Sequence, residues 1–129
     1  MPVQYLQIVS VPVSSQDQAR DFYVNSLGWE LLSDEGYELA DGRQHRWLEV
    51  RPPGGQTAIT LVLADETMRA GSMKGMILRA SDLATTIADL AGRGVSMARE
   101  VQETPWASYV SFDDPDGNSW MIQELRSAR

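Results

Sequence analysis

The chain has 129 residues and no cysteine, and its 18 acidic and 11 basic residues give a formal net charge of -7. This length suits one domain. The negative charge disfavours binding to nucleic-acid phosphates and to anionic membranes. The absence of thiols excludes disulfides, zinc–thiolate sites and cysteine nucleophiles, and fits the reducing environment of the cytoplasm.

We also expect neither a secretory signal nor a membrane span. Residues 1–10 lack a basic segment followed by an apolar core. Every apolar run is shorter than the roughly 20 residues that a membrane helix needs. These features favour a cytoplasmic protein.

The first half of the chain predicts a strand, a helix and then three more strands. The helix begins after a cap at Ser14 or Ser15 and ends at Gly28, with apolar residues at helical spacing between them. The predicted strands are 3–13, 29–33, 46–50 and 57–63, and residues 34–44 predict a loop or a hairpin.

The second half predicts the same order of elements. Its helix is capped by Ser81 and Asp82 and ends at Gly92 or Gly94. The predicted strands are 74–80, 95–100, 108–112 and 119–125, with an irregular stretch over 101–107 and a turn over 114–117. The two halves of the chain therefore repeat the same order of predicted elements, although few of their residues are identical.

One half, with one helix and four strands, is too small to bury a core alone. We therefore predict an α+β fold in which two paired βαβββ modules form a curved mixed sheet around a cleft. The single domain covers residues 1–129, with a first module over 1–64 and a second over 73–129. Residues 64–73 are a plausible hinge, and the modules can pair within a chain or between chains.

Four segments resemble the vicinal oxygen chelate superfamily of glyoxalases, extradiol dioxygenases, fosfomycin-resistance enzymes and bleomycin-resistance proteins. They are VSVPVSSQDQARDFYVNSLGWEL (9–31), RWLEVRPPGG (46–55), ASDLATTIADLAGRGV (80–95) and FDDPDGNSWMI (112–122). The resemblance implies paired βαβββ modules and a homodimer. It does not imply one reaction, because this scaffold hosts many.

Enzymes of this family hold a metal ion with His, Gln or Glu at four strand positions. Carried onto this chain, those positions are Ile8, Gly75, Met121 and a residue near Thr60 or Leu61. A shift of one residue would offer Gln7, Lys74, Trp120 or Ile122, of which only Gln7 binds metals in the ordinary way. Because a divalent ion needs several converging nitrogen or oxygen donors, we expect no metal, no cofactor and no catalytic residue.

The alternation of side chains along each strand predicts which residues line the cleft. Six residues of the strands at 46–50, 108–112 and 119–125 face the helices, and their odd-numbered neighbours face the cleft. The six are Leu48, Val50, Val110, Phe112, Trp120 and Ile122. The predicted ligand-binding residues are Ile8, Ser10, His45, Trp47, Glu49, Trp106, Tyr109, Ser111, Met121 and Gln123. Aromatic walls suit flat ligands, Met121 adapts to their shape, and Glu49 suits an amine or a guanidinium.

Four of these residues have an alternative structural role. Trp47 can pack against a dimer partner, and Trp106 is either a lid or a loop anchor. His45 is either a solvated residue at a loop end or a base. Glu49 can pair with an arginine across the strands.

The sequence favours a metal-free small-molecule-binding protein of the bleomycin-resistance type. It would sequester an apolar or aromatic ligand such as an antibiotic or a secondary metabolite. Three alternatives remain open: a glyoxalase- or dioxygenase-like enzyme with a metal bound through Gln7, His45 or Glu49, a metal-free acid–base enzyme that uses Glu49 or His45, and a dimeric interaction module without a ligand.

Overall fold

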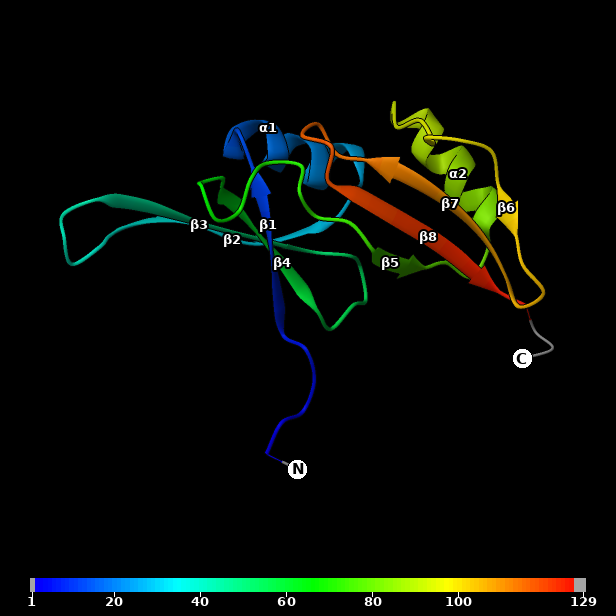
Figure 1. Cartoon of the computed structure of the whole chain (residues 1–129), viewed down its shortest axis with the longest axis horizontal. Helices are drawn as coiled ribbons and strands as arrows, with labels where there is room; N and C mark the ends of the chain where they lie inside the picture. The colour runs from blue at the N-terminus through cyan, green and yellow to red at the C-terminus, as the bar shows by residue number, and fades with distance from the viewer. Residues whose placement is uncertain (1, 127–129) are drawn as a thin grey trace.

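The computed structural model describes residues 2–126 and contains the same order of elements twice (Figure 1). The first module contains β1 (Ile8–Val13), α1 (Gln16–Arg20), the π-helix η1 (Asp21–Ser26), β2 (Glu30–Glu38), β3 (Gln44–Arg51) and β4 (Ala58–Leu63). The second contains β5 (Met76–Arg79), α2 (Leu83–Gly92), β6 (Gln102–Glu103), β7 (Ala107–Asp113) and β8 (Ser119–Leu125). The predicted α+β fold of two βαβββ modules is confirmed. No helix within residues 2–126 is long and apolar enough to span a membrane.

Each module contributes one mixed sheet of four strands. The strand orders are β1-β4-β3-β2 and β5-β8-β7-β6, which are equivalent positions in the two modules. The first and last strands of each module, β1 with β4 and β5 with β8, run parallel, and the other pairs are antiparallel. The strands thus form two separate sheets rather than one continuous curved sheet, and the equal orders establish the internal repeat.

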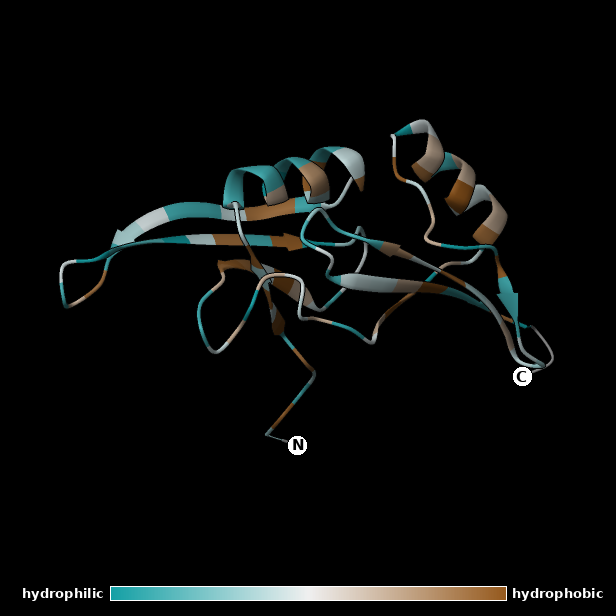
Figure 2. Cartoon of the chain, turned by 45° about the horizontal axis from the view of Figure 1, so that its top comes forward, coloured by the Kyte–Doolittle hydropathy of each residue, from teal (hydrophilic) through white to brown (hydrophobic). Residues whose placement is uncertain are grey.

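The helices cover one face of each sheet, and the core lies between them (Figure 2). The alternation predicted which residues face this core. They are Leu48 and Val50 of β3, Val110 and Phe112 of β7, and Trp120 and Ile122 of β8, each at most 3% exposed. This part of the prediction is confirmed.

Side-chain caps begin both helices at predicted residues. Ser15 Oγ accepts a 3.1 Å hydrogen bond from the Gln18 N–H, and Asp82 Oδ1 accepts one of 3.0 Å from the Thr85 N–H. The hydrogen bonds from Thr85 are the main reason why the pKa of Asp82 is lowered. Gly28, with a φ of +76°, follows η1 in the left-handed conformation that glycine tolerates best. The widening of the first helix into a π-helix was not predicted.

Two predicted strand boundaries and one predicted strand are wrong. The strand predicted over 3–13 begins only at Ile8, where pairing with β4 starts, and Val3 and Leu6 are 72% and 63% exposed. The strand predicted over 95–100 does not form, and one backbone hydrogen bond, from the Ala98 N–H to the Ser111 carbonyl, joins this segment to β7. β2 continues to Glu38, since its polar second half pairs with β3. Of the loop and the hairpin predicted over 34–44, the hairpin forms, and it extends away from the body of the molecule (Figure 1).

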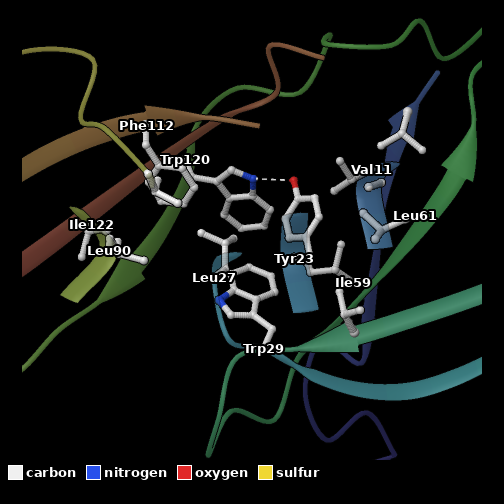
Figure 3. Close-up of a cluster of buried hydrophobic side chains, with 14 of the residues drawn as sticks. Val11, Tyr23, Leu27, Trp29, Ile59, Leu61, Leu90, Phe112, Trp120 and Ile122 are labelled. Carbon is white, nitrogen blue, oxygen red and sulfur yellow. Dashed lines mark hydrogen bonds between the residues drawn. The ribbon is translucent and has the colours of Figure 1, made fainter. Parts of the chain in front are cut away.

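Aromatic side chains join the two modules on the helix side of the sheets (Figure 3). The rings of Trp29 and Trp120 meet edge to face, with centroids 5.2 Å apart. Tyr23 lies against both of these rings, and Trp120 Nε1 donates a 2.9 Å hydrogen bond to the Tyr23 hydroxyl. The two modules therefore share one core.

Candidate functional site

The face of each sheet opposite the helices is the open face of its module. Nine of the predicted ligand-binding residues alternate along the strands with core residues, so their side chains lie on this face, and all nine are half-buried. They are Ile8, Ser10, His45, Trp47, Glu49, Tyr109, Ser111, Met121 and Gln123. Trp106 lies in the loop before β7 and is 49% exposed.

The open face of the first module carries an indole beside a carboxylate. Trp47 Nε1 donates a 2.9 Å hydrogen bond to Glu49 Oε1. Glu49 lies opposite Thr60, and the hydroxyls of Thr60 and Ser10 are 3.1 Å apart. Polar groups on β3, β4 and β1 thus form a row next to the Trp47 ring.

His45 lies further along β3, on the hairpin. Its ring packs against Tyr37 of β2, with centroids 5.0 Å apart. The register pairs these two residues, and Tyr37 is 43% exposed. The structure therefore gives His45 an aromatic neighbour rather than a carboxylate that would orient it as a base.

The open face of the second module mixes apolar and polar side chains. Tyr109 lies opposite Gln123, and Ser111 lies opposite Met121. Ile77 of β5 lies on the other side of Met121 and is 56% exposed. A phenol, a thioether and an aliphatic side chain are therefore grouped on this face.

The residues at the family's metal positions do not fit a metal ion. Ile8 and Met121 supply hydrocarbon and a thioether, and Gly75 has no side chain. Thr60 supplies one hydroxyl, which is already paired with Ser10. Within residues 2–126 no cluster of three or more His, Asp or Glu side chains could hold an ion. A divalent ion prefers several charged or imidazole donors, which these four positions do not provide.

An ion-pair network fixes the hairpin to the first helix. Arg46 donates hydrogen bonds of 2.7 and 2.9 Å to Asp34 and one of 2.7 Å to Asp17, and Arg20 also pairs with Asp34. The hydrogen bonds from Arg46 are the main reason why the pKa of Asp34 falls to about 2. Because Arg46 directly precedes Trp47, this network holds the part of β3 that carries the indole.

A separate cavity of about 1040 Å³ lies between the modules. Its lining includes the core residues Trp29, Phe112 and Trp120 and the exposed residues Arg79 and Asp89. None of the ten predicted ligand-binding residues lines it. Sequence reasoning did not find this cavity, because its apolar lining has the same pattern as an ordinary core.

A family model described as the Glyoxalase/Bleomycin resistance protein/Dioxygenase superfamily matches residues 5–122. The chain belongs to this superfamily. The predicted resemblance is therefore confirmed, and it extends over nearly the whole length of the protein.

Two solved structures and a bacterial relative are similar to this chain over nearly its whole length. TnmS3, an antibiotic binding protein from Streptomyces sp. CB03234, is 39% identical, with a TM-score of 0.85 over 98% of this chain and 99% of that one. A glyoxalase/bleomycin resistance protein from the same strain is 40% identical, with a TM-score of 0.76 over 92% and 98%. The uncharacterized protein YetH of Bacillus subtilis (strain 168) is 30% identical over 95% of this chain and 99% of its own length.

Proposed function

We propose that this protein binds an aromatic or apolar small molecule, such as an antibiotic or a secondary metabolite, and sequesters it without a metal ion. The observation that carries this proposal is the replacement of metal-donor side chains by other residues on the open faces. Ile8, Thr60 and Met121 stand where enzymes of the family have metal donors, and Trp47 and Tyr109 stand beside them. The 39% identity with an antibiotic binding protein supports the same class of ligand.

The geometry of the first module suits a flat ligand. The hydrogen bond to Glu49 restrains the Trp47 ring, so a ligand that stacks on it meets an ordered surface. Such stacking contributes about 0.5–1.5 kcal/mol per ring pair beyond the burial of area. Met121 adds an adaptable surface in the second module.

We further propose that a homodimer closes the site. Within one chain the modules join through their helix sides, at Trp29 and Trp120, which leaves both open faces accessible. A second copy that brings its second module over the first module would enclose the ligand between the two open faces. The exposed apolar residue Ile77, at 56% on the open face of the second module, supports such a contact.

Fluorescence titration against a panel of aromatic antibiotics tests the ligand class. Ligand binding should quench Trp47, and Trp47→Phe should remove most of the quenching and weaken binding about tenfold. Trp106→Phe removes the exposed indole in the loop before β7, so it measures separately the quenching of the lid predicted there. If no compound in the panel quenches the wild-type protein, the proposed ligand class is wrong.

Two measurements test the rest of the proposal. Elemental analysis of protein purified without chelators should find no stoichiometric metal, and a metal held through Gln7, His45 or Glu49 would contradict sequestration without an ion. Light scattering after size exclusion should give the mass of a dimer. A monomer that binds ligand with full affinity would contradict closure by a second copy.

One observation favours an enzyme as the second candidate. Glu49 is a half-buried carboxylate on the open face, where an acid–base catalyst would lie. A catalytic role predicts that Glu49→Gln abolishes turnover of a bound compound while its binding persists. A binding protein predicts that no such turnover occurs in the wild type.

A further inference from the structure

The cavity lies between the modules. Its lining joins core residues of the helix side to the edge strand β5, whose Ile77 and Arg79 pair in register with Met121 and Gln123 of the open face. We propose that the cavity is a second binding site, which takes a flat aromatic molecule carrying an acidic group. Its volume of about 1040 Å³ is comparable to the roughly 300–1,000 Å³ of cavities that hold drug-sized ligands. Both modules contribute to its lining, so an occupant would touch both.

The floor of the cavity is aromatic and apolar. Trp29, Phe112 and Trp120 line it and are 7%, 1% and 3% exposed. The edge-to-face packing of Trp29 on Trp120 holds both rings in place, and the Trp120 N–H is already bonded to Tyr23. A ligand over this floor touches the edges of these rings without displacing a polar partner of Trp120. It gains area burial against Leu6, Ile77 and Leu78, which also line the cavity and are more exposed.

The spare charge at the mouth of the cavity is positive. Arg79 lines the mouth and makes no ion pair within residues 2–126. Asp89, the acidic residue of the lining, is paired with Arg93 at 3.3 Å. An acidic group on the ligand would therefore find an arginine without a competing carboxylate, although the chain as a whole carries a net charge of -7.

The backbone of β5 supplies further donors. β5 is the edge strand of its sheet, paired only with β8, and all of its residues from Met76 to Arg79 line the cavity. An edge strand presents unpaired N–H groups along its free side. These groups and the Ser81 hydroxyl, which also lies in the lining, favour an anionic ligand group.

A pair of dyes that differ in one group tests this chemistry. The acidic probe is 8-anilinonaphthalene-1-sulfonate, and the neutral probe is N-phenyl-1-naphthylamine, which has the same rings without the sulfonate. The acidic probe should bind with one saturable site per chain, more tightly than the neutral probe, and accept energy from tryptophan. Arg79→Gln should weaken the acidic probe about fivefold to tenfold and leave the neutral probe unchanged.

Substitutions that fill the cavity with a larger side chain show whether the probes bind there. Thr86 lines the cavity from α2 and is half-buried, so Thr86→Trp should abolish the binding of both probes. Ala88→Trp places the same side chain on an exposed position of the same helix and should change neither affinity. If Thr86→Trp does not fold, Ser81→Phe fills the cavity from its exposed rim, and the same loss is expected.

Three outcomes would overturn the proposal. Trp47→Ala should leave both probes bound, and a loss there with no effect of Thr86→Trp would place the probes on the open face. If both probes bind with equal affinity and Arg79→Gln changes neither, the site does not select for an acidic group. A shift of Thr86→Trp from dimer to monomer without loss of probe would mean that a second copy of the chain occupies the cavity. The first outcome would leave the proposed function intact, since that function rests on the open faces.

Discussion

The Tyr23 hydroxyl donates a 2.7 Å hydrogen bond to Asp114 Oδ2, from the first helix to the turn before β8 in the second module. The same oxygen accepts a 2.8 Å hydrogen bond from Asn118 Nδ2. Asp114 Oδ1 accepts hydrogen bonds of 2.9 Å from the backbone N–H groups of Asp116 and Asn118. Tyr23 is fully buried, and burial, followed by the charge of Asp114, raises its pKa well above the usual range. Tyr23 is therefore a permanent donor that fastens the two modules together.

Removing this hydroxyl should destabilise the protein. Tyr23→Phe leaves an acceptor site on buried Asp114 and the Trp120 N–H without their partner, so the free energy of unfolding should fall by about 1–3 kcal/mol. Urea denaturation measures the change. Tyr109→Phe, on the half-buried open face, is the matched control and should cost less than about 0.5 kcal/mol. Equal losses for both variants would mean that the contact with Asp114 contributes nothing specific.

The sequence predicted the turn that holds Asp114 but not its role. Asp-Pro-Asp-Gly is a strong local turn signal, since proline and glycine favour the backbone angles that a turn needs. The partner of Asp114, however, lies 91 residues away in the chain. A local pattern contains no information about a contact of that separation, so the fastening between the modules became visible only in the structure.

Alternation predicted the faces of the strands well, but propensity alone did not predict pairing. Leu48 and Val50 face the core because side chains alternate, whatever the neighbouring strand is. Residues 3–7 and 95–100 have suitable compositions, yet neither segment forms a strand, since a strand also needs a partner along its edge. The site follows the same rule. Alternation placed Trp47 and Glu49 together, whereas the cavity at Trp29 and Trp120 depends on how the two modules pack.

Acid should weaken the connection between the hairpin and the first helix. The folded pKa of Asp34 is about 2, against an ordinary value of 3.8, chiefly because of the hydrogen bonds from Arg46. Since the folded value is the lower one, this stabilisation is complete above about pH 5 and is lost as the pH falls toward 2. Arg20 is 46% exposed, so solvent screening reduces the contribution to about 1 kcal/mol.

Urea denaturation of Asp34→Asn at several pH values measures this contribution. The difference in unfolding free energy between wild type and variant should be about 1 kcal/mol larger at pH 7 than at pH 2.5. Asp41→Asn is the control. Its ion pair with Arg43 should contribute little at any pH, because the side chains of Asp41 and Arg43 are 54% and 75% exposed. A wild-type advantage over Asp34→Asn that is independent of pH would contradict the assignment.

The connector between the modules packs closely on the turn that contains Asp114. Gly71 has a φ of +79°, and a Cβ there would lie 2.1 Å from the carbonyl oxygen of Asp116. Gly71→Ala should therefore cost both the strain of positive φ, about 1–2 kcal/mol, and a displacement of the turn. Gly42→Ala has a φ of +87° with open space around its Cβ, so it should cost the strain alone. Urea denaturation of both variants separates the two effects, and equal losses would show that the connector can move away from the turn freely.

Glu49 should select for positive charge among aromatic ligands on the open face. Glu49→Gln removes the carboxylate charge but keeps an oxygen that can accept the Trp47 N–H, so the indole should stay in place. Binding of proflavine, a cationic aromatic dye, should weaken about fivefold to tenfold. A neutral aromatic ligand should bind with unchanged affinity. Glu66→Gln removes one negative charge from an exposed loop and controls for net charge. If Glu66→Gln weakens proflavine as much as Glu49→Gln does, the effect is a long-range one and Glu49 does not face the ligand.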